Sequence, residues 1–415
     1  MTNGDAASGA PPASTLAGAR SGASAQAGAG AGSGAAARSN PAPRPGAAAQ
    51  SVAELLPDFP WDTLAPYAAA AAAHPDGIVD LSVGTPVDPV PATVRAALAA
   101  AADSPGYPRT GGTPVLRRAA ADWLRRAHGV TVSPDAVLPL IGSKEFVAGL
   151  PSWLGVDAQD WVAYPELAYP TYEVGAILAG AQTAATDRLD VLGPAPVRLI
   201  WVNSPSNPTG RVLSAAQLRT IVDWARPRGT IVASDECYLE LGWDRDSPPV
   251  SVLHPSVCRG SHEGLLAVHS LSKRSNLAGY RAGFVTGDPA LVAELLEIRK
   301  HSGFMVPGPV QAAMVAALGD DEHVAEQRER YRSRRAALWP AFRAAGFQIE
   351  HSTAGLYLWA TAGEGCWDSV RRLADVGILV APGSFYGPGG SRHIRIALTA
   401  TDERITAAVE RLALL

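Results

Sequence analysis

Residues 265–284 read LLAVHSLSKRSNLAGYRAGF, and they contain the most informative lysine of the chain. The apolar run over residues 265–269 is typical of a buried strand. Lys273 follows it directly, which is unusual because burying an ammonium group is costly. On its own, such a lysine is most simply interpreted as a surface residue with a packed stem. A buried lysine, however, has a lowered pKa and can form a Schiff base with an aldehyde.

Working outward, further short apolar runs alternate with helical patterns. In residues 214–229, SAAQLRTIVDWARPRG, Ser214 is a favourable N-cap and apolar residues recur on one helical face. Apolar strands alternating with amphipathic helices predict an α/β fold with a mainly parallel sheet covered on both faces. The other expected strands are residues 161–164, 198–202, 230–233 and 283–286.

The last third of the chain has a different pattern. Residues 319–346 form a long, charged helical stretch, and short strand-like runs follow it. This order predicts a smaller α+β domain. The strand-like runs lie around residues 355–360, 378–380 and 394–398.

Composition excludes several classes of protein. The 415 residues carry 35 Lys and Arg against 39 Asp and Glu, so the net charge of −4 gives no reason to expect a nucleic-acid or membrane partner. Three separated cysteines without a CxxC motif argue against a disulfide framework or a Cys-rich zinc site, and we expect no metal and a cytoplasmic protein. Residues 1–50 are dominated by Ala, Gly, Pro and Ser, which predicts a disordered extension.

Asp235 lies in TIVASDECYLEL, residues 230–241, just past a β-branched run. Ligands of open α/β sheets bind at the carboxyl ends of such strands. An Asp-Glu pair alone is often a solvated turn. An acid here can also keep the ring nitrogen of pyridoxal phosphate (PLP) protonated, which that cofactor needs as an electron sink. Tyr238 could then donate to the phenolate oxygen of the ring.

Polar residues at two further turns suit phosphate binding. In IGSKEFVAGLP, residues 141–151, a helical pattern follows Gly142, and N–H groups at a helix start bind anions. Ser270 and Arg281 flank Lys273 and can hold phosphate oxygens. Each motif alone could be an ordinary turn. NSPSNPTG, residues 203–210, adds weight because Asn207 precedes Asp235 by 28 residues and Asp235 precedes Lys273 by 38.

In this order and spacing, the motifs resemble the class I/II PLP-dependent aminotransferases of fold type I, from about Leu55 to the C-terminus. The resemblance implies a large domain with a mainly parallel seven-stranded sheet and a smaller α+β domain. It places the large domain at residues 91–305 and the small domain at 306–415. Residues 51–90 would form an N-terminal arm and part of the small domain.

The resemblance also implies roles for individual residues. Lys273 resembles the lysine that forms the Schiff base and moves the proton between the substrate α-carbon and cofactor C4′. Asp235 resembles the partner of the pyridinium nitrogen, so Lys273, Asp235 and Tyr238 are the expected catalytic residues. The other implied cofactor contacts are Asn207 and Tyr238 at the phenolate oxygen, Ser143, Lys144, Ser270 and Arg281 at the phosphate, and Tyr169 on the ring face.

The substrate contacts follow from the same resemblance. Arg395, in HIRIAL, resembles the arginine that clamps the substrate α-carboxylate by a bidentate pair. Gly84 and Asn207 would lie beside the substrate. Tyr107 resembles the tyrosine that reaches the phosphate of a partner subunit, which implies a homodimer with shared active sites.

More specific strings, including LPDFPWDTL, PELAYPTYEVGA and APGSFYGPGG, resemble the actinobacterial N-succinyldiaminopimelate aminotransferases. This implies amino transfer between glutamate and N-succinyl-2-amino-6-oxopimelate, on the route to diaminopimelate and lysine. Arg109 and Arg274 are our candidates for the distal carboxylates of that substrate. Surface exposure or structural pairing is the alternative for both.

Three other functions remain open at this stage. The same cofactor apparatus would serve an aminotransferase for another amino acid or a C–S β-lyase. A PLP-binding transcriptional regulator would need a DNA-binding module, and we expect none in residues 1–50.

Overall fold

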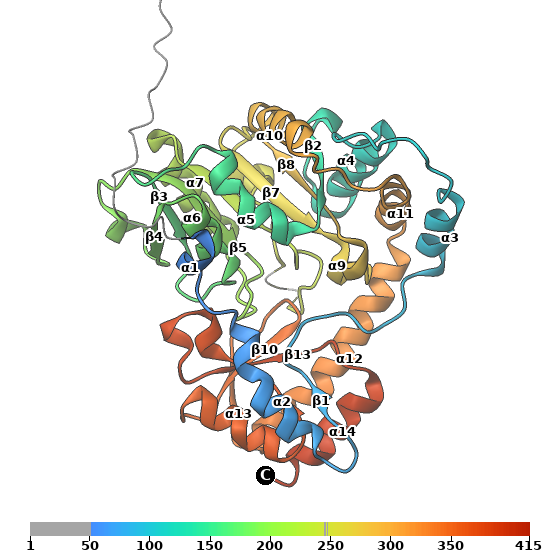
Figure 1. Cartoon of the computed structure of the whole chain (residues 1–415), viewed down its shortest axis with the longest axis vertical. Helices are drawn as coiled ribbons and strands as arrows, with labels where there is room; N and C mark the ends of the chain where they lie inside the picture. Colours follow the sequence, from blue (N-terminus) through green and yellow to red (C-terminus); the bar gives the residue numbers. More distant parts are fainter. Residues whose placement is uncertain (1–50, 245, 247) are drawn as a thin grey trace, which may run out of the picture. The chain divides into compact units, whose positions relative to one another are not determined.

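The computed structural model describes residues 51–244, 246 and 248–415, so the extension expected over residues 1–50 lies outside the described residues. A seven-stranded sheet dominates the fold (Figure 1). Only β8 runs antiparallel to its neighbours. All five expected strands are confirmed, and β2 and β4 complete the edges. In sheet order, the strands are β2 (Val137–Ile141), β8 (Ala282–Gly287), β7 (Leu265–Ser270), β6 (Ile231–Asp235), β5 (Val197–Asn203), β3 (Trp161–Tyr164) and β4 (Gln182–Ala185).

Helices cover both faces of this sheet because its strands are apolar on both sides. In β7, Leu265 and Ala267 pack in one core while Leu266 and Val268 pack in the other, as the alternation of side chains along a strand requires. The first core is built with α3 (Ala92–Ala100), α4 (Pro114–His128), α7 (Ala215–Ala225), α8 (Pro255–Cys258) and α11 (Gly308–Leu318). The second contains α5 (Ser143–Trp153), α6 (Thr171–Leu178) and α10 (Pro289–Ser302).

The predicted helix α7 begins where its sequence indicates. The Ser214 hydroxyl accepts a hydrogen bond from the Gln217 amide at 3.3 Å, and the Gln217 side chain accepts one from the Ser214 amide at 2.9 Å. This capping box satisfies two amides that the helix itself leaves without partners. Leu218, Val222 and Ala225 form its buried face.

The smaller α+β part contains two short sheets. Its antiparallel sheet has the order β12 (Ala381–Pro382), β13 (Ile394–Ala397), β10 (Tyr357–Thr361) and β9 (Gln348–Glu350). A separate parallel pair joins β1 (Val79–Asp80) to β11 (Ile378–Leu379), so both ends of the described chain build one core. The helices around it are α2 (Ala65–Ala72), α12 (Glu322–Ala344), α13 (Cys366–Asp375) and α14 (Asp402–Leu412).

The position of α11 differs from the boundary that we expected at residue 306. Ala313, Met314 and Ala317 pack in the core beneath the large sheet, against α3 and α4. Their apolar surface is complementary to α3 and α4, which precede the sheet in sequence. The chain passes into the small core only with α12, whose Tyr331, Leu338 and Phe342 pack there.

An ion-pair network holds the segment after β1 against the helices of the small core. Asp88 accepts from the Arg334 guanidinium at 2.6 and 2.8 Å, and the same guanidinium donates to Asp402 at 2.7 Å. Arg334 is buried, so both contacts are shielded from solvent on one side. In the part of the chain that the structure describes, no helix combines the length and apolarity needed to cross a membrane.

Candidate active site

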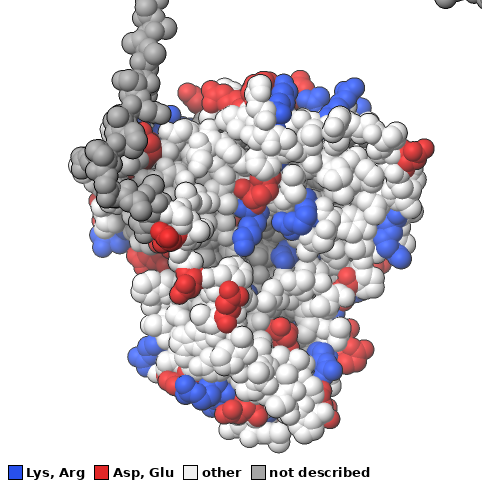
Figure 2. Space-filling model, in the orientation of Figure 1, with Lys and Arg blue, Asp and Glu red and all other residues white. Residues whose placement is uncertain are grey.

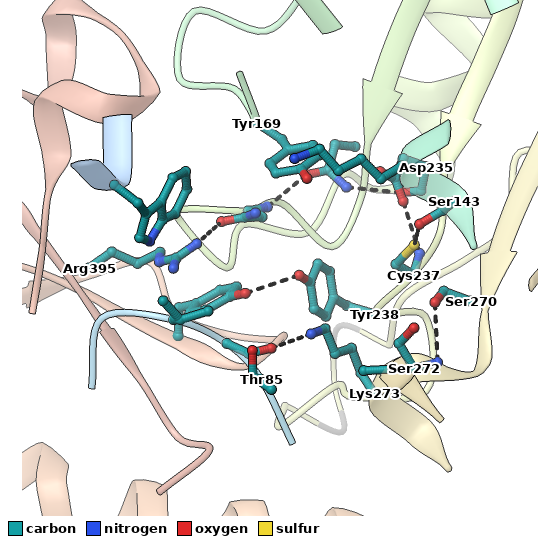
Figure 3. A pocket seen from close by; sticks show the side chains of 18 of the residues that line it. Thr85, Ser143, Tyr169, Asp235, Cys237, Tyr238, Ser270, Ser272, Lys273 and Arg395 are labelled. Atoms are coloured by element: carbon teal, nitrogen blue, oxygen red, sulfur yellow. Dashed lines mark hydrogen bonds between the residues drawn. The ribbon is translucent and has the colours of Figure 1, made fainter. Parts of the chain in front are cut away.

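A cavity of about 500 Å³ lies where the carboxyl ends of β5, β6 and β7 face the small antiparallel sheet (Figure 3). Eleven of the fourteen residues that the sequence indicated line this cavity, although they come from positions 84 to 395. Tyr107, Arg109 and Arg274 do not. The eleven are Gly84, Ser143, Lys144, Tyr169, Asn207, Asp235, Tyr238, Ser270, Lys273, Arg281 and Arg395.

Asp235 ends β6 as a buried carboxylate. Its two oxygens accept hydrogen bonds from the Tyr172 hydroxyl at 2.8 Å and from the Cys237 amide at 3.2 Å. Burial raises the pKa of Asp235, and these donors act against that rise. No described lysine, arginine or histidine forms an ion pair with this side chain, so the carboxylate can accept a cationic partner from the cavity.

Lys273 lies in the short helix α9 (Leu271–Arg274), which begins directly after β7. The Ser270 hydroxyl caps α9 by accepting from the Ser272 amide at 3.2 Å. The Lys273 ammonium donates a hydrogen bond to the Gly84 carbonyl. Burial lowers the pKa of Lys273 and outweighs the opposing effects of Tyr357 and Cys237, and the positive charges of Arg395 and Arg281 lower it further. A less protonated amine is a better nucleophile and base.

Backbone geometry brings a cationic and polar cluster to one end of the cavity. Gly142, with φ of 73°, precedes α5, and a Cβ built there would lie 2.1 Å from the Arg281 guanidinium. Arg281 itself has a positive φ of 54°. The start of α5 thereby faces Arg281, Ser143 and Ser270 within the cavity lining. Helix-start amides, hydroxyls and a guanidinium together form a suitable site for a phosphate.

Arg395, in β13, lies at the opposite side of the cavity from this cluster in Figure 3. Its guanidinium donates to the Asn207 side chain at 2.9 Å and to the Ser82 carbonyl at 2.6 Å. The ring of Tyr357 lies 3.9 Å from it. Arg395 is buried, and no described carboxylate pairs with it. An oriented, unpaired guanidinium of this kind suits a substrate carboxylate.

Sequence reasoning missed several cavity residues. Tyr172 contacts Asp235, and Tyr357 contacts both Tyr238 and Arg395. Tyr172 stands three residues after Tyr169, in the first turn of α6, and this proximity in sequence could have indicated it. Tyr357 had no comparable signal because it comes from a strand of the small sheet. The other missed lining residues include Phe59, Trp61, Thr85 and Cys237.

Three nominated side chains lie elsewhere. Tyr107 is 95% exposed, and Arg109 is exposed outside this cavity. The hypothesis that Arg274 reads a substrate carboxylate is wrong for this geometry. Its buried guanidinium lies 2.5 Å from the Glu240 carboxylate and 4.9 Å from the Trp123 ring, so it is a structural partner.

A second buried pair accompanies Arg274 behind the β6 and β7 ends. Glu236 accepts from the Val252 amide at 2.8 Å, and its other oxygen lies 3.7 Å from His269. Burial raises the pKa of Glu236 to about 7 and lowers the pKa of His269 well below its ordinary value. Both groups therefore favour their neutral forms in the folded protein.

Fold and site together define a PLP-dependent enzyme of fold type I. The family model for aminotransferase class I and II matches residues 76–412, and the chain belongs to this family. Its members use pyridoxal 5′-phosphate, and the site fits that group. One cavity is surrounded by the Asp235 carboxylate, which has no ion-pair partner among the described residues, the Lys273 amine, and a cluster of groups suited to a phosphate. The enzyme is thus a transaminase.

Comparisons with individual proteins give several relatives. The chain is 62% identical over 357 residues to the 4-dedimethylamino-4-oxo-anhydrotetracycline transaminase OxyQ of Streptomyces rimosus, covering 86% of this chain and 99% of that protein. It is 63% identical over 366 residues to a probable aminotransferase of Mycobacterium tuberculosis, covering 88% and 87%. The structure of N-succinyldiaminopimelate aminotransferase from M. tuberculosis matches with a TM-score of 0.76 at 26% identity, covering 85% and 96%.

The contact between Tyr172 and Asp235 predicts a loss of stability on Tyr172→Phe. That change leaves a buried carboxylate oxygen without its donor, which should lower the free energy of unfolding of the cofactor-free protein by about 1–3 kcal/mol. Urea denaturation measures it. Tyr386→Phe is the matched control because the buried Tyr386 hydroxyl has no hydrogen-bond partner in the described structure. Equal losses in the two variants would contradict the role of the contact.

Glu236 predicts a pH dependence of stability. Between pH 4.5 and about 7 the folded protein retains the Glu236 proton that the unfolded chain has released, so the contribution of Glu236 to stability falls as the pH rises through this window. Buried histidines such as His269 act in the opposite direction, because burial lowers their pKa. Glu236→Gln keeps an acceptor for Val252 and should remove about 3 kcal/mol of that fall. Denaturation of the cofactor-free proteins at several pH values tests this, with the exposed Glu263→Gln as control. Burial lowers the pKa of His128 to about 4, and its effect on the pH dependence of stability is the same in the wild type and in both variants. Parallel pH profiles of wild type and Glu236→Gln would refute the prediction.

Proposed function

We propose that this transaminase moves the amino group between glutamate and N-succinyl-2-amino-6-oxopimelate, which would place it in diaminopimelate and lysine biosynthesis. The observation that carries the amino-transfer part is that one cavity combines a buried amine, a cation-free carboxylate and an oriented guanidinium. The acceptor rests on the sequence strings around residues 56–64, 165–176 and 381–390.

PLP supplies an electron sink that stabilises negative charge on the substrate α-carbon. Asp235 would hold its ring nitrogen protonated, and Asn207 and Tyr238 would hydrogen-bond its phenolate oxygen. Tyr169 would pack on the ring face. The phosphate would be held by Ser143, Lys144, Ser270 and Arg281.

Lys273 would serve as the base. Its amine is buried and has a lowered pKa, so a fraction of it is free to take the proton from the substrate α-carbon. The Gly84 carbonyl, which accepts from this amine, orients it within the cavity. An arginine could not do this work because the guanidinium stays protonated in proteins.

Arg395 would bind the α-carboxylate of both substrates. Its contacts with Asn207 and Ser82 fix the plane of the guanidinium, so little side-chain freedom remains to be lost when a carboxylate pairs with it. Asn207 would thus contact both the cofactor and the residue that binds substrate.

Anionic substrates suit the charge around the cavity. Lys and Arg side chains gather beside a hollow in the middle of the face shown in Figure 2. In the described cavity lining, Lys144 and Arg281 are already engaged in the proposed phosphate site. A cation for the succinyl carboxylate would then come from a partner subunit. A homodimer with shared sites would supply Arg109 for this purpose and Tyr107 for the phosphate.

The high identity to OxyQ supports a second candidate acceptor. That relative is named for an anhydrotetracycline intermediate, a bulky ketone, and it is 62% identical to this chain. Phe59 and Trp61 place two aromatic rings in the cavity lining, 5.7 Å apart, where an aromatic acceptor could pack. The frame alone would also serve a transaminase for another amino acid or a C–S β-lyase.

The amino-transfer proposal predicts that Lys273→Ala abolishes turnover. The purified wild type should show the visible absorbance of bound PLP and should aminate N-succinyl-2-amino-6-oxopimelate from glutamate. Lys273→Ala should lose at least about 10³-fold in kcat, because the base and nucleophile are removed together. Activity retained by Lys273→Ala would refute the proposal, and activity only on unsuccinylated or polycyclic ketones would refute its acceptor.

The proposed role of Arg109 predicts a substrate-selective defect. Arg109→Ala should lower kcat/KM for the succinylated acceptor by about tenfold or more, the loss expected for one charge-assisted contact, and should leave glutamate nearly unaffected. Steady-state kinetics with both substrates measure this. Arg343→Ala, an exposed arginine of α12 outside the cavity lining, is the control. An unchanged kcat/KM for the succinylated acceptor would exclude Arg109.

A further inference from the structure

Tyr357 occupies a position that the proposed mechanism does not yet use. It belongs to β10 of the small sheet, is only 4% exposed, and lines the cavity. Its hydroxyl lies 3.2 Å from the Tyr238 hydroxyl, a hydrogen bond drawn as a dashed line from Tyr238 in Figure 3. The face of its ring lies against the Arg395 guanidinium at 3.9 Å. One side chain therefore contacts the two residues proposed to hold cofactor and substrate.

The Tyr357 hydroxyl also lies directly over the Gly84 backbone. A Cβ built on Gly84 would come within 2.1 Å of that oxygen, so only glycine permits this approach. The Gly84 carbonyl in turn accepts from Lys273. The ring is thus confined between the Gly84 segment, Tyr238 and Arg395, and its hydroxyl has little freedom to point elsewhere.

The direction of the hydrogen bond between the two tyrosines follows from their surroundings. Burial raises the pKa of Tyr357, but the charges of Arg395 and Lys273, together with the hydrogen bond to Tyr238, outweigh it and lower that pKa below the ordinary value of tyrosine. Burial raises the pKa of Tyr238 well above that value. The other titratable groups near Tyr357 are neutral, because burial raises the pKa of each: Cys237, Tyr169, Tyr331 and Tyr386. The Tyr238 hydroxyl has a single proton, which its proposed role gives to the cofactor, so the 3.2 Å hydrogen bond between the two tyrosines is donated by Tyr357. The lower pKa of Tyr357 agrees with this direction.

We propose that Tyr357 is a positioning residue whose hydroxyl and ring have separate roles. Its hydroxyl, by donating to Tyr238, leaves the Tyr238 proton free for the phenolate oxygen of the cofactor. Its ring holds the Arg395 guanidinium in place for the substrate carboxylate. This inference rests on the proposed roles of Tyr238 and Arg395 and extends them.

The role of the hydroxyl depends on the way in which one hydrogen bond polarises the next. A hydroxyl that accepts one hydrogen bond donates a stronger one, so Tyr357 strengthens the bond that Tyr238 gives to the phenolate. Without Tyr357, the phenolate is less stabilised and keeps the proton that it shares with the Lys273 nitrogen to a higher pH. The ring part rests on the attraction between a desolvated guanidinium and an aromatic face.

Two substitutions separate these parts. Tyr357→Phe removes the hydroxyl and keeps the ring. In the PLP-loaded enzyme, the pH midpoint of the visible absorbance of the cofactor should rise by roughly 0.5–1, which corresponds to one lost hydrogen bond, and KM for glutamate should change less than about twofold. Tyr357→Leu also removes the ring, and its KM for glutamate should rise about tenfold above that of Tyr357→Phe.

Tyr386→Phe is the matched control. The Tyr386 ring also lies near Arg395, at 4.9 Å, but its buried hydroxyl has no partner in the described structure. Its absorbance midpoint should equal that of the wild type. A general effect of deleting a buried tyrosine hydroxyl near Arg395 would move both midpoints alike.

The outcomes separate this inference from the proposed function. A wild type without the PLP absorbance or without transamination would refute the function itself. A normal wild type with an unmoved midpoint in Tyr357→Phe would overturn the role of the hydroxyl. Equal KM values in Tyr357→Phe and Tyr357→Leu would overturn the role of the ring. If Tyr357→Leu fails to fold, the absorbance midpoint of Tyr357→Phe still tests the role of the hydroxyl. Tyr357→His then tests the role of the ring, because it keeps an aromatic ring with a smaller face. Its KM for glutamate should rise by an intermediate amount.

Discussion

The constraint that shapes this molecule is the removal of three charges from water. Asp235 and Arg395 are buried and Lys273 is half-buried around one cavity, and taking an ion out of water costs several kcal/mol unless other groups solvate it. The surrounding fold supplies such groups: a tyrosine hydroxyl and an amide for the carboxylate, a carbonyl for the amine, and a carbonyl with an amide oxygen for the guanidinium. These partners restrain the charges without neutralising them, which leaves each one available to a ligand.

The sequence indicated Asp235 and Lys273 because each follows a local rule, whereas Arg395 came from the resemblance to a family. Asp235 and Lys273 stand at the ends of apolar runs, and parallel strands place their carboxyl ends at one edge. Most of the other site residues came from the resemblance to a family rather than from such rules. The partners that solvate the charges were harder to predict. Tyr172 and Tyr357 come from a helix face and a strand of the other sheet, and only the tertiary structure brings them to the cavity. The hypothesis for Arg274 was wrong for the same reason, because nothing near Arg274 in the sequence indicates that Glu240 lies beside it.

The proposed function assigns reaction and substrate to different places in this architecture. The sheet ends carry the groups proposed to hold the cofactor, and the family match covers residues 76–412. The N-terminal segment with Phe59 and Trp61 and the exposed loop with Tyr107 and Arg109 lie outside that frame.

The pairing of β1 with β11 joins residues about 300 positions apart, because Val79 lies beside Ile378. During synthesis on the ribosome, the large sheet with Asp235 and Lys273 can form while residues 319–415 are still missing, because β8 and α11 precede them. The core around Val79 cannot close until β11 and β13 have emerged, and Arg395 arrives with them. A nascent chain would therefore acquire the groups proposed to hold the cofactor well before it could hold a substrate.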